Sequence, residues 1–170
     1  MTYYRTRTYI AADWTNDIDA VEQLRKWNES NHLSLSFTDA HDLKQARDGS
    51  LNCTIKNSLR DRLNASKTFV LIVGNKTKDL RSGSCSYCPY YFLYSCSKRY
   101  PVDFRSYIEF ECDKAISDGL KIVVLYNSTR VDKTKCPEVI QKYGIHVAMK
   151  EYKYGHVYWD YAAVRDAIMD

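Results

Sequence analysis

Short apolar runs alternate with amphipathic stretches along the whole chain, and this alternation predicts an α/β fold. The runs expected to form strands are residues 8–12, 33–37, 68–73, 120–126 and 146–148. Residues 68–73 and 120–126 are almost continuously apolar, which is typical of central parallel strands buried on both faces. Residues 33–37 alternate between apolar and polar, which indicates a strand at a sheet edge.

In the segments between these strands, apolar residues recur at the spacing of an α-helix. The expected helix stripes are Ile18, Val21 and Leu24 after a cap at Thr15 or Asn16; Ile55, Leu59 and Leu63; Ile108, Cys112, Ala115 and Ile116; and Tyr161, Val164 and Ile168. A short helix is expected after Pro137, closed by Gly144. Strands that alternate with helices predict right-handed crossovers.

The predicted fold is a flavodoxin-like, doubly wound sheet of about five parallel strands in the order 2-1-3-4-5. One insertion, Asn75–Arg105, separates strands three and four, and residues 1–170 are expected to form a single domain. Ligands of such sheets bind beyond the carboxyl ends of the strands, near the switch point between strands one and three. The candidates for the site are therefore residues 12–14, residues 38–41, and the loop and helix start after strand three.

Composition narrows the possible partners. The 170 residues carry a net charge of +4, and the densest basic run is the pair Lys98-Arg99, so we expect no nucleic-acid binding. No apolar run reaches the length that spans a bilayer, and the N-terminus lacks the apolar segment of a signal peptide. We therefore expect a cytoplasmic protein whose six cysteines are reduced thiols.

Three functional classes are frequent in this fold, and the sequence lacks the motif of each. No G-x-G-x-x-G follows the first strand and no G-x-x-x-x-G-K-[ST] is present, which argues against a classical dinucleotide site and a P-loop. A response-regulator receiver needs a phosphoacceptor aspartate at the end of strand three. The chain has Val73-Gly74-Asn75 at that point.

The helix that follows the insertion holds the most informative carboxylates. Ser106 and Glu109 have the spacing of a capping box, which gives Glu109 a structural role. Glu111 lies at the margin of the apolar stripe, on the same side as Tyr107. One interpretation is an acid near the helix start that the helix dipole favours. The other is a carboxylate that holds a ribose hydroxyl and stabilises the cation formed when a glycosidic bond breaks.

Several segments together resemble the TIR-like family of the Thoeris antiphage proteins, which are stand-alone bacterial TIR domains. These segments are Arg7-Thr8-Tyr9-Ile10, Phe37-Thr38-Asp39-Ala40-His41, Ile55-Lys56-x-x-Leu59, Ser66-Lys67-Thr68 with the strand up to Gly74 and Thr77, and Tyr107-Ile108-x-x-Glu111. The last is similar to the W-V-x-x-E pattern of NAD-cleaving TIR domains, with Tyr107 in place of the usual tryptophan. The resemblance covers roughly residues 6 to 150.

The resemblance implies an enzyme of the NAD glycohydrolase or ADP-ribosyl cyclase type, latent until a phage component triggers it. It would use NAD as substrate, need no cofactor, and make a cyclic or conjugated ADP-ribose messenger that activates a partner effector; a homo-oligomer is also implied. Carried over, Glu111 is the catalytic acid and Tyr107 the stacking aromatic. The substrate-binding candidates are Asp13, Trp14, Asp39, His41 and Tyr107.

The cysteines and histidines leave two further possibilities open. Cys85-x-x-Cys88 with Cys96 suggests zinc, but a structural zinc site needs a fourth ligand that is missing locally, so we expect no metal. Cys53, Cys112 and Cys136 are expected to be small core residues, since they fall in helical or pre-helical positions. A Cys/His nucleophile pair lacks a supporting motif. The histidines other than His41 are expected to be structural: His32, His146, and His156 in the linker before the last helix.

Two other functions compete with NAD cleavage. A non-enzymatic TIR interaction module would bind partners through its surface. A nucleoside deoxyribosyltransferase-like enzyme would also use a glutamate near a helix start, but it acts on deoxynucleosides. Base release from NAD or from deoxynucleosides separates all three.

Overall fold

A parallel sheet forms the centre of the computed structural model, which describes residues 7–30, 35 and 51–170. Its strands are β1 (Arg7–Ala11), β2 (Ser66–Val73), β5 (Lys121–Tyr126) and β6 (Ile145–Ala148), in the order β1-β2-β5-β6. These are the expected first, third, fourth and fifth strands, side by side in the expected sequence. Of the expected strand 33–37 only Leu35 is described, and it is fully buried. The place of that strand, and with it the count of five, lies outside the described residues.

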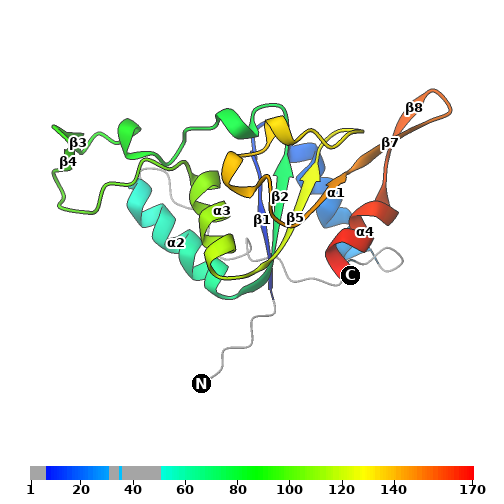
Figure 1. Cartoon of the computed structure of the whole chain (residues 1–170), viewed down its shortest axis with the longest axis horizontal. Coiled ribbons are helices and arrows are strands. Elements are labelled where there is room, and N and C mark those ends of the chain that lie inside the picture. The colour runs from blue at the N-terminus through cyan, green and yellow to red at the C-terminus, as the bar shows by residue number, and fades with distance from the viewer. Residues whose placement is uncertain (1–6, 31–34, 36–50) are drawn as a thin grey trace, which may run out of the picture.

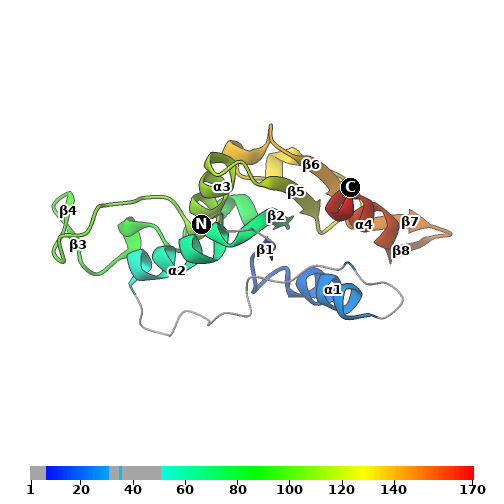
Figure 2. The ribbon, with the colours of Figure 1, turned by 90° about the horizontal axis from the view of Figure 1, so that it is seen from below.

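Two pairs of helices cover the two faces of the sheet (Figures 1 and 2). On one face lie α2 (Asn52–Asn64) and α3 (Tyr107–Ser117), and on the other lie α1 (Ile18–Glu29) and α4 (Tyr161–Met169). Alternate residues of each strand point to opposite faces, so β2 sends Phe69 and Leu71 to the first core and Val70 and Ile72 to the second. The nearly continuous apolar run of β2 follows from this double burial.

The start of α1 differs from the expectation. The N-cap is Asp17, not Thr15 or Asn16, and Ile18 is exposed instead of belonging to the buried stripe. The residues of α1 that are buried are Ala20, Val21, Leu24 and Trp27. The helix begins later because Asp13 closes a turn over residues 15 and 16, which holds them outside the helix.

The insertion between β2 and α3 extends away from the sheet (Figure 1). It contains a small antiparallel pair, β3 (Tyr91–Phe92) and β4 (Ser95–Cys96), joined through Leu93 and Tyr94 at positive φ. Many of its large apolar side chains are exposed, among them Tyr87, Phe92, Leu93 and Tyr94.

The expected short helix after Pro137 is a single 3₁₀ turn, Glu138–Ile140.

A second hairpin projects from the opposite end of the molecule (Figures 1 and 2). It consists of β7 (Lys150–Lys153) and β8 (His156–Trp159), paired antiparallel. The prediction that His156 lies in a linker was therefore wrong, because His156 begins β8. Among the described residues, no helix is long and apolar enough to cross a membrane.

Candidate functional site

A small cavity opens at the carboxyl end of β1, between α2 and α3. We call it the Glu111 pocket; its volume is about 230 Å³. It is lined by Ala12, Asp13, Trp14, Ile55, Leu59, Leu80, Ser82, Tyr107, Ile108 and Glu111. Four of the six substrate-site and catalytic candidates thus line one cavity, which is the place that the topology of a doubly wound sheet favours.

Glu111 supplies a buried ionisable group to the lining of this pocket. The residue is only 5% exposed, and its carboxylate accepts a hydrogen bond from the Tyr9 hydroxyl. Burial raises the pKa of Glu111 to about 7, and the Tyr9 hydrogen bond and the Arg62 charge oppose that rise. A carboxyl group whose pKa lies near neutrality, inside a mainly apolar cavity, is characteristic of functional sites.

Helix α3 gives its two glutamates, Glu109 and Glu111, different roles. Ser106 Oγ accepts from the Glu109 backbone N–H at 3.1 Å, and the Glu109 carboxylate accepts from the Ser106 N–H at 2.8 Å. The expected capping box is therefore present, and Glu109 is occupied by it. Glu111 is the fifth helical residue and is buried, so the helix dipole, which acts mainly in the first turn, does not account for its position.

Tyr107 forms one wall of the pocket and is held on three sides. Its hydroxyl donates to Asn52 Oδ1 at 2.9 Å, and its backbone N–H donates to the Ser82 carbonyl at 2.8 Å. Its ring lies against the backbone of Gly83. Partial burial raises the pKa of the Tyr107 hydroxyl to about 12. The ring is therefore fixed beside Glu111, as an aromatic that stacks on a substrate requires.

Gly83 makes this close approach possible, which leads to a first testable expectation. Its φ is +98°, and an added Cβ would lie 2.6 Å from the Tyr107 ring. Gly83→Ala should therefore destabilise the fold by about 1–3 kcal/mol, which lowers the thermal midpoint by about 2–12 °C. Gly119→Ala is the matched control, because Gly119 also has positive φ but no atom within 4 Å of the added Cβ. Equal losses in the two variants would show that the contact with Tyr107 contributes nothing.

Asp13 and Trp14 line the pocket, but each also interacts with residues outside the pocket lining. Asp13 Oδ1 accepts from the backbone N–H groups of Thr15 and Asn16 at 3.0 and 3.2 Å, and Oδ2 accepts from the Asn16 side chain at 2.6 Å. The Asp13 carboxylate thus shapes the loop after β1. Trp14 is half-buried with the Arg25 guanidinium 5.0 Å from its ring centre, which leaves it an aromatic surface at the pocket edge.

The structure does not describe two of the candidate residues, and it places one group of cysteines in the insertion. Asp39 and His41 lie outside the described residues, so their substrate-binding roles stay predictions. Cys85, Cys88 and Cys96 are free thiols of the insertion. Over residues 7–30, 35 and 51–170, no three His, Cys, Asp or Glu side chains gather as metal ligands.

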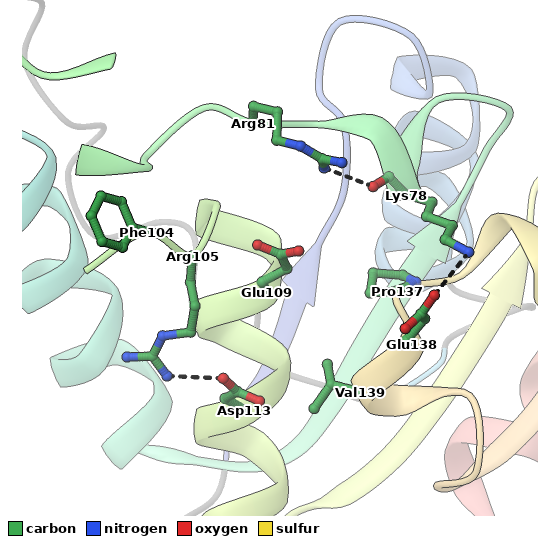
Figure 3. A pocket seen from close by; sticks show the side chains of 9 residues that line it. All are labelled: Lys78, Arg81, Phe104, Arg105, Glu109, Asp113, Pro137, Glu138 and Val139. Carbon is green, nitrogen blue, oxygen red and sulfur yellow. Dashed lines mark hydrogen bonds and ion pairs between the residues drawn. The ribbon is translucent and has the colours of Figure 1, made fainter. Parts of the chain in front are cut away.

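A larger cavity, about 600 Å³, is lined by Arg81, the residue between Leu80 and Ser82 of the Glu111 pocket (Figure 3). Its lining contains three basic residues, Lys78, Arg81 and Arg105, and three acidic residues, Glu109, Asp113 and Glu138. Several of these charges are paired: Arg105 contacts Asp113 at 2.9 Å and Lys78 contacts Glu138 at 3.5 Å. Glu111 is absent from its walls, so the smaller Glu111 pocket is the better candidate for chemistry.

Tyr9 is a member of the site that the sequence did not reveal. It lies in the middle of β1, fully buried and stacked on Phe69 with ring centres 5.9 Å apart. The signal available in the sequence was a hydroxyl in a core strand, because a buried tyrosine hydroxyl needs a partner. That partner is 102 residues away along the chain.

Comparison with known families supports the resemblance. Residues 3–82 match the family described as Thoeris protein ThsB, TIR-like domain. No curated protein matches the chain. The matched segment contains β1, α1, α2 and β2 and ends at Ser82, a residue of the Glu111 pocket. Residues 3–82, which are 80 of the 170 residues, are therefore similar to the TIR-like domain of the Thoeris ThsB proteins.

Proposed function

We propose that this protein is a TIR-domain enzyme of antiphage defence that cleaves the nicotinamide–ribose bond of NAD. The observation that carries the proposal is the buried carboxylate of Glu111 in the lining of a cavity that Tyr107 and Trp14 also line. Its products would be nicotinamide and a cyclic or conjugated ADP-ribose messenger for a partner effector. The family match supports the Thoeris assignment, and the cavity supports the chemistry.

The electrostatics of the pocket suit this reaction. The nicotinamide ring of NAD carries a positive charge, and a cation beside a carboxylate lowers that carboxylate's pKa. Substrate binding would therefore ionise Glu111, which is about half protonated near its pKa of about 7. The ionised carboxylate would then stabilise the oxocarbenium-like charge that develops on the ribose as nicotinamide departs. Its low-dielectric surroundings would strengthen that interaction.

The Tyr9 hydroxyl would keep Glu111 ionised and in place. Its hydrogen bond is one of the two influences that lower the pKa of Glu111. Tyr9→Phe removes that bond, so the pKa should rise further and a smaller fraction of Glu111 should be ionised at neutral pH. The acidic limb of the profile of kcat/KM against pH for nicotinamide release should move to higher pH. An unmoved limb would show that Tyr9 does not tune the reacting carboxylate.

An interaction module is the second candidate, favoured by the exposed apolar side chains of the two hairpins, such as Phe92, Tyr94 and Tyr154. One experiment separates the candidates: purified protein is incubated with NAD or with deoxynucleosides, with and without lysate of infected cells, and base release is followed by chromatography. Release of nicotinamide alone supports the proposal. Release of bases from deoxynucleosides favours the deoxyribosyltransferase-like function. Release of neither by folded protein favours the interaction module.

A further inference from the structure

A cavity at the base of the insertion has a mainly basic lining. It is formed by α2, by the two ends of the insertion and by the start of α3, and we call it the Arg60 cavity. Its volume is about 390 Å³, and ligand sites commonly occupy about 300–1,000 Å³. The lining holds three basic residues, Lys56, Arg60 and Arg105, and one acidic residue, Asp103. This balance of charge favours an anion.

The three basic side chains converge on one aromatic ring, that of Phe110. From the centre of this ring, Lys56 Nζ is 5.8 Å away, Arg60 Cζ is 5.6 Å away and Arg105 Cζ is 5.1 Å away. The face of an aromatic ring attracts cations, which accounts for part of this arrangement. Three cations at one ring also repel one another, so the arrangement is favourable only with anionic partners.

Among the described residues, carboxylates pair with two of these three cations. Asp103 Oδ2 lies 3.3 Å from Lys56 Nζ and 2.9 Å from Arg105 Nη2. Asp113, which does not line the cavity, lies 2.9 Å from Arg105 Nη1. Lys56 is only 4% exposed and also donates to the Arg105 carbonyl at 2.7 Å. Lys56 is therefore a fixed part of the cavity wall.

Arg60 differs from the other two cations, because no carboxylate within residues 7–30, 35 and 51–170 forms an ion pair with it. It is exposed on α2, and its Nη1 donates to Asn57 Oδ1 at 3.1 Å. Arg105 is exposed as well, and its bonds to Asp103 and Asp113 use three of the five N–H groups of a guanidinium. Two accessible guanidinium groups thus offer N–H donors to one cavity.

We propose that the Arg60 cavity binds a nucleotide, with Arg60 and Arg105 in contact with its phosphate groups. The planar guanidinium group matches two oxygens of a phosphate, and such charge-assisted hydrogen bonds are about twice as strong as neutral ones. Tyr100, which lines the same cavity and is half exposed, offers a ring on which a base can stack. A ligand without negative charge would leave the Arg60 charge without a partner.

This site is separate from the Glu111 pocket, and the inference does not rest on the proposed function. The two cavities share no lining residue. They are neighbours through Gly83, which lines the Arg60 cavity and lies against the ring of Tyr107, a residue of the Glu111 pocket. A nucleotide in the Arg60 cavity would therefore lie close to the segment that holds Tyr107.

Calorimetric titration of the full chain with ADP tests the inference, with adenosine as the ligand that lacks phosphate. The parent should bind ADP and should bind adenosine at least about ten-fold more weakly. Arg60→Gln should weaken ADP binding by about 10–100-fold, the effect of losing hydrogen bonds to a charged group. Arg165→Gln is the matched control: Arg165 is an exposed arginine of α4 whose Cζ lies 5.7 Å from the Tyr161 ring centre. It should bind ADP as the parent does.

Thermal unfolding shows that each variant is folded and measures binding independently. With ADP about ten-fold above the Kd of the parent, the midpoints of the parent and Arg165→Gln should rise by about 3–6 °C over a NaCl control of equal ionic strength. Arg60→Gln should rise by less than about 2 °C at the same ADP concentration. No ADP binding by the parent, equal affinity of the parent for ADP and adenosine, or parent-like binding by folded Arg60→Gln would overturn the proposal.

Discussion

Glu111→Gln is expected to slow nicotinamide release from NAD by about 10²–10³-fold, the effect of removing one group that stabilises transition-state charge. Glutamine keeps the shape of the side chain and can still accept a hydrogen bond from Tyr9, but it carries no charge. The expected loss is in kcat, because the interaction develops as the ribose becomes cationic. The measurement is the initial rate of nicotinamide release under activating conditions.

Glu109→Gln is the matched control, two residues away on the same helix. Glu109 closes the capping box through its carboxylate, and glutamine can partly preserve that bond. This variant should keep nearly all activity and lose a little stability. If Glu111→Gln releases nicotinamide as fast as the parent, the carboxylate is not the catalytic group.

The dependence of stability on pH should reveal the same carboxylate without any substrate. The pKa of Glu111 rises from its ordinary 4.5 to about 7 on folding, so the folded state binds more protons than the unfolded state between these values. The contribution of Glu111 is therefore fully present below about pH 4.5 and is lost as the pH rises through 7. The rise corresponds to about 3 kcal/mol. Parent stability should fall over this window relative to Glu111→Gln.

The test is a set of thermal or urea unfolding curves for parent and Glu111→Gln between about pH 4 and pH 9. The stability of the variant minus that of the parent should grow by about 3 kcal/mol, or by about 6–12 °C in thermal midpoint. Other titrating groups, such as His146, occur in both proteins and cancel in the difference. A difference that stays constant with pH would mean that Glu111 ionises in the folded protein as it does in the unfolded chain.

The sequence predicted the elements that local patterns determine. The apolar run 68–73 became the doubly buried strand β2, and Ser106 with Glu109 became the capping box of α3. The relative order of the four described strands also followed from the alternation of strands and helices. These features depend on residues close together in sequence or on the general geometry of parallel sheets.

Features that depend on distant partners or on a short turn were not predicted from the sequence. Nothing near Tyr9 in sequence indicates that its hydroxyl meets Glu111, and nothing near Asp17 indicates that its carboxylate meets Asn127 instead of capping α1. The β7–β8 hairpin did have a local signal. Tyr154 and Gly155 both have positive φ, as a two-residue hairpin turn requires, and they separate two alternating segments.

Product analysis of NAD-treated protein tests the central claim most directly. Parent and Glu111→Gln would be incubated with NAD, with and without lysate of phage-infected cells, and the small molecules would be identified by mass spectrometry. We predict nicotinamide and an ADP-ribose-derived product from the activated parent and neither above background from the variant. Intact NAD in every sample of folded, triggered parent protein would contradict the assignment of Glu111 to NAD cleavage.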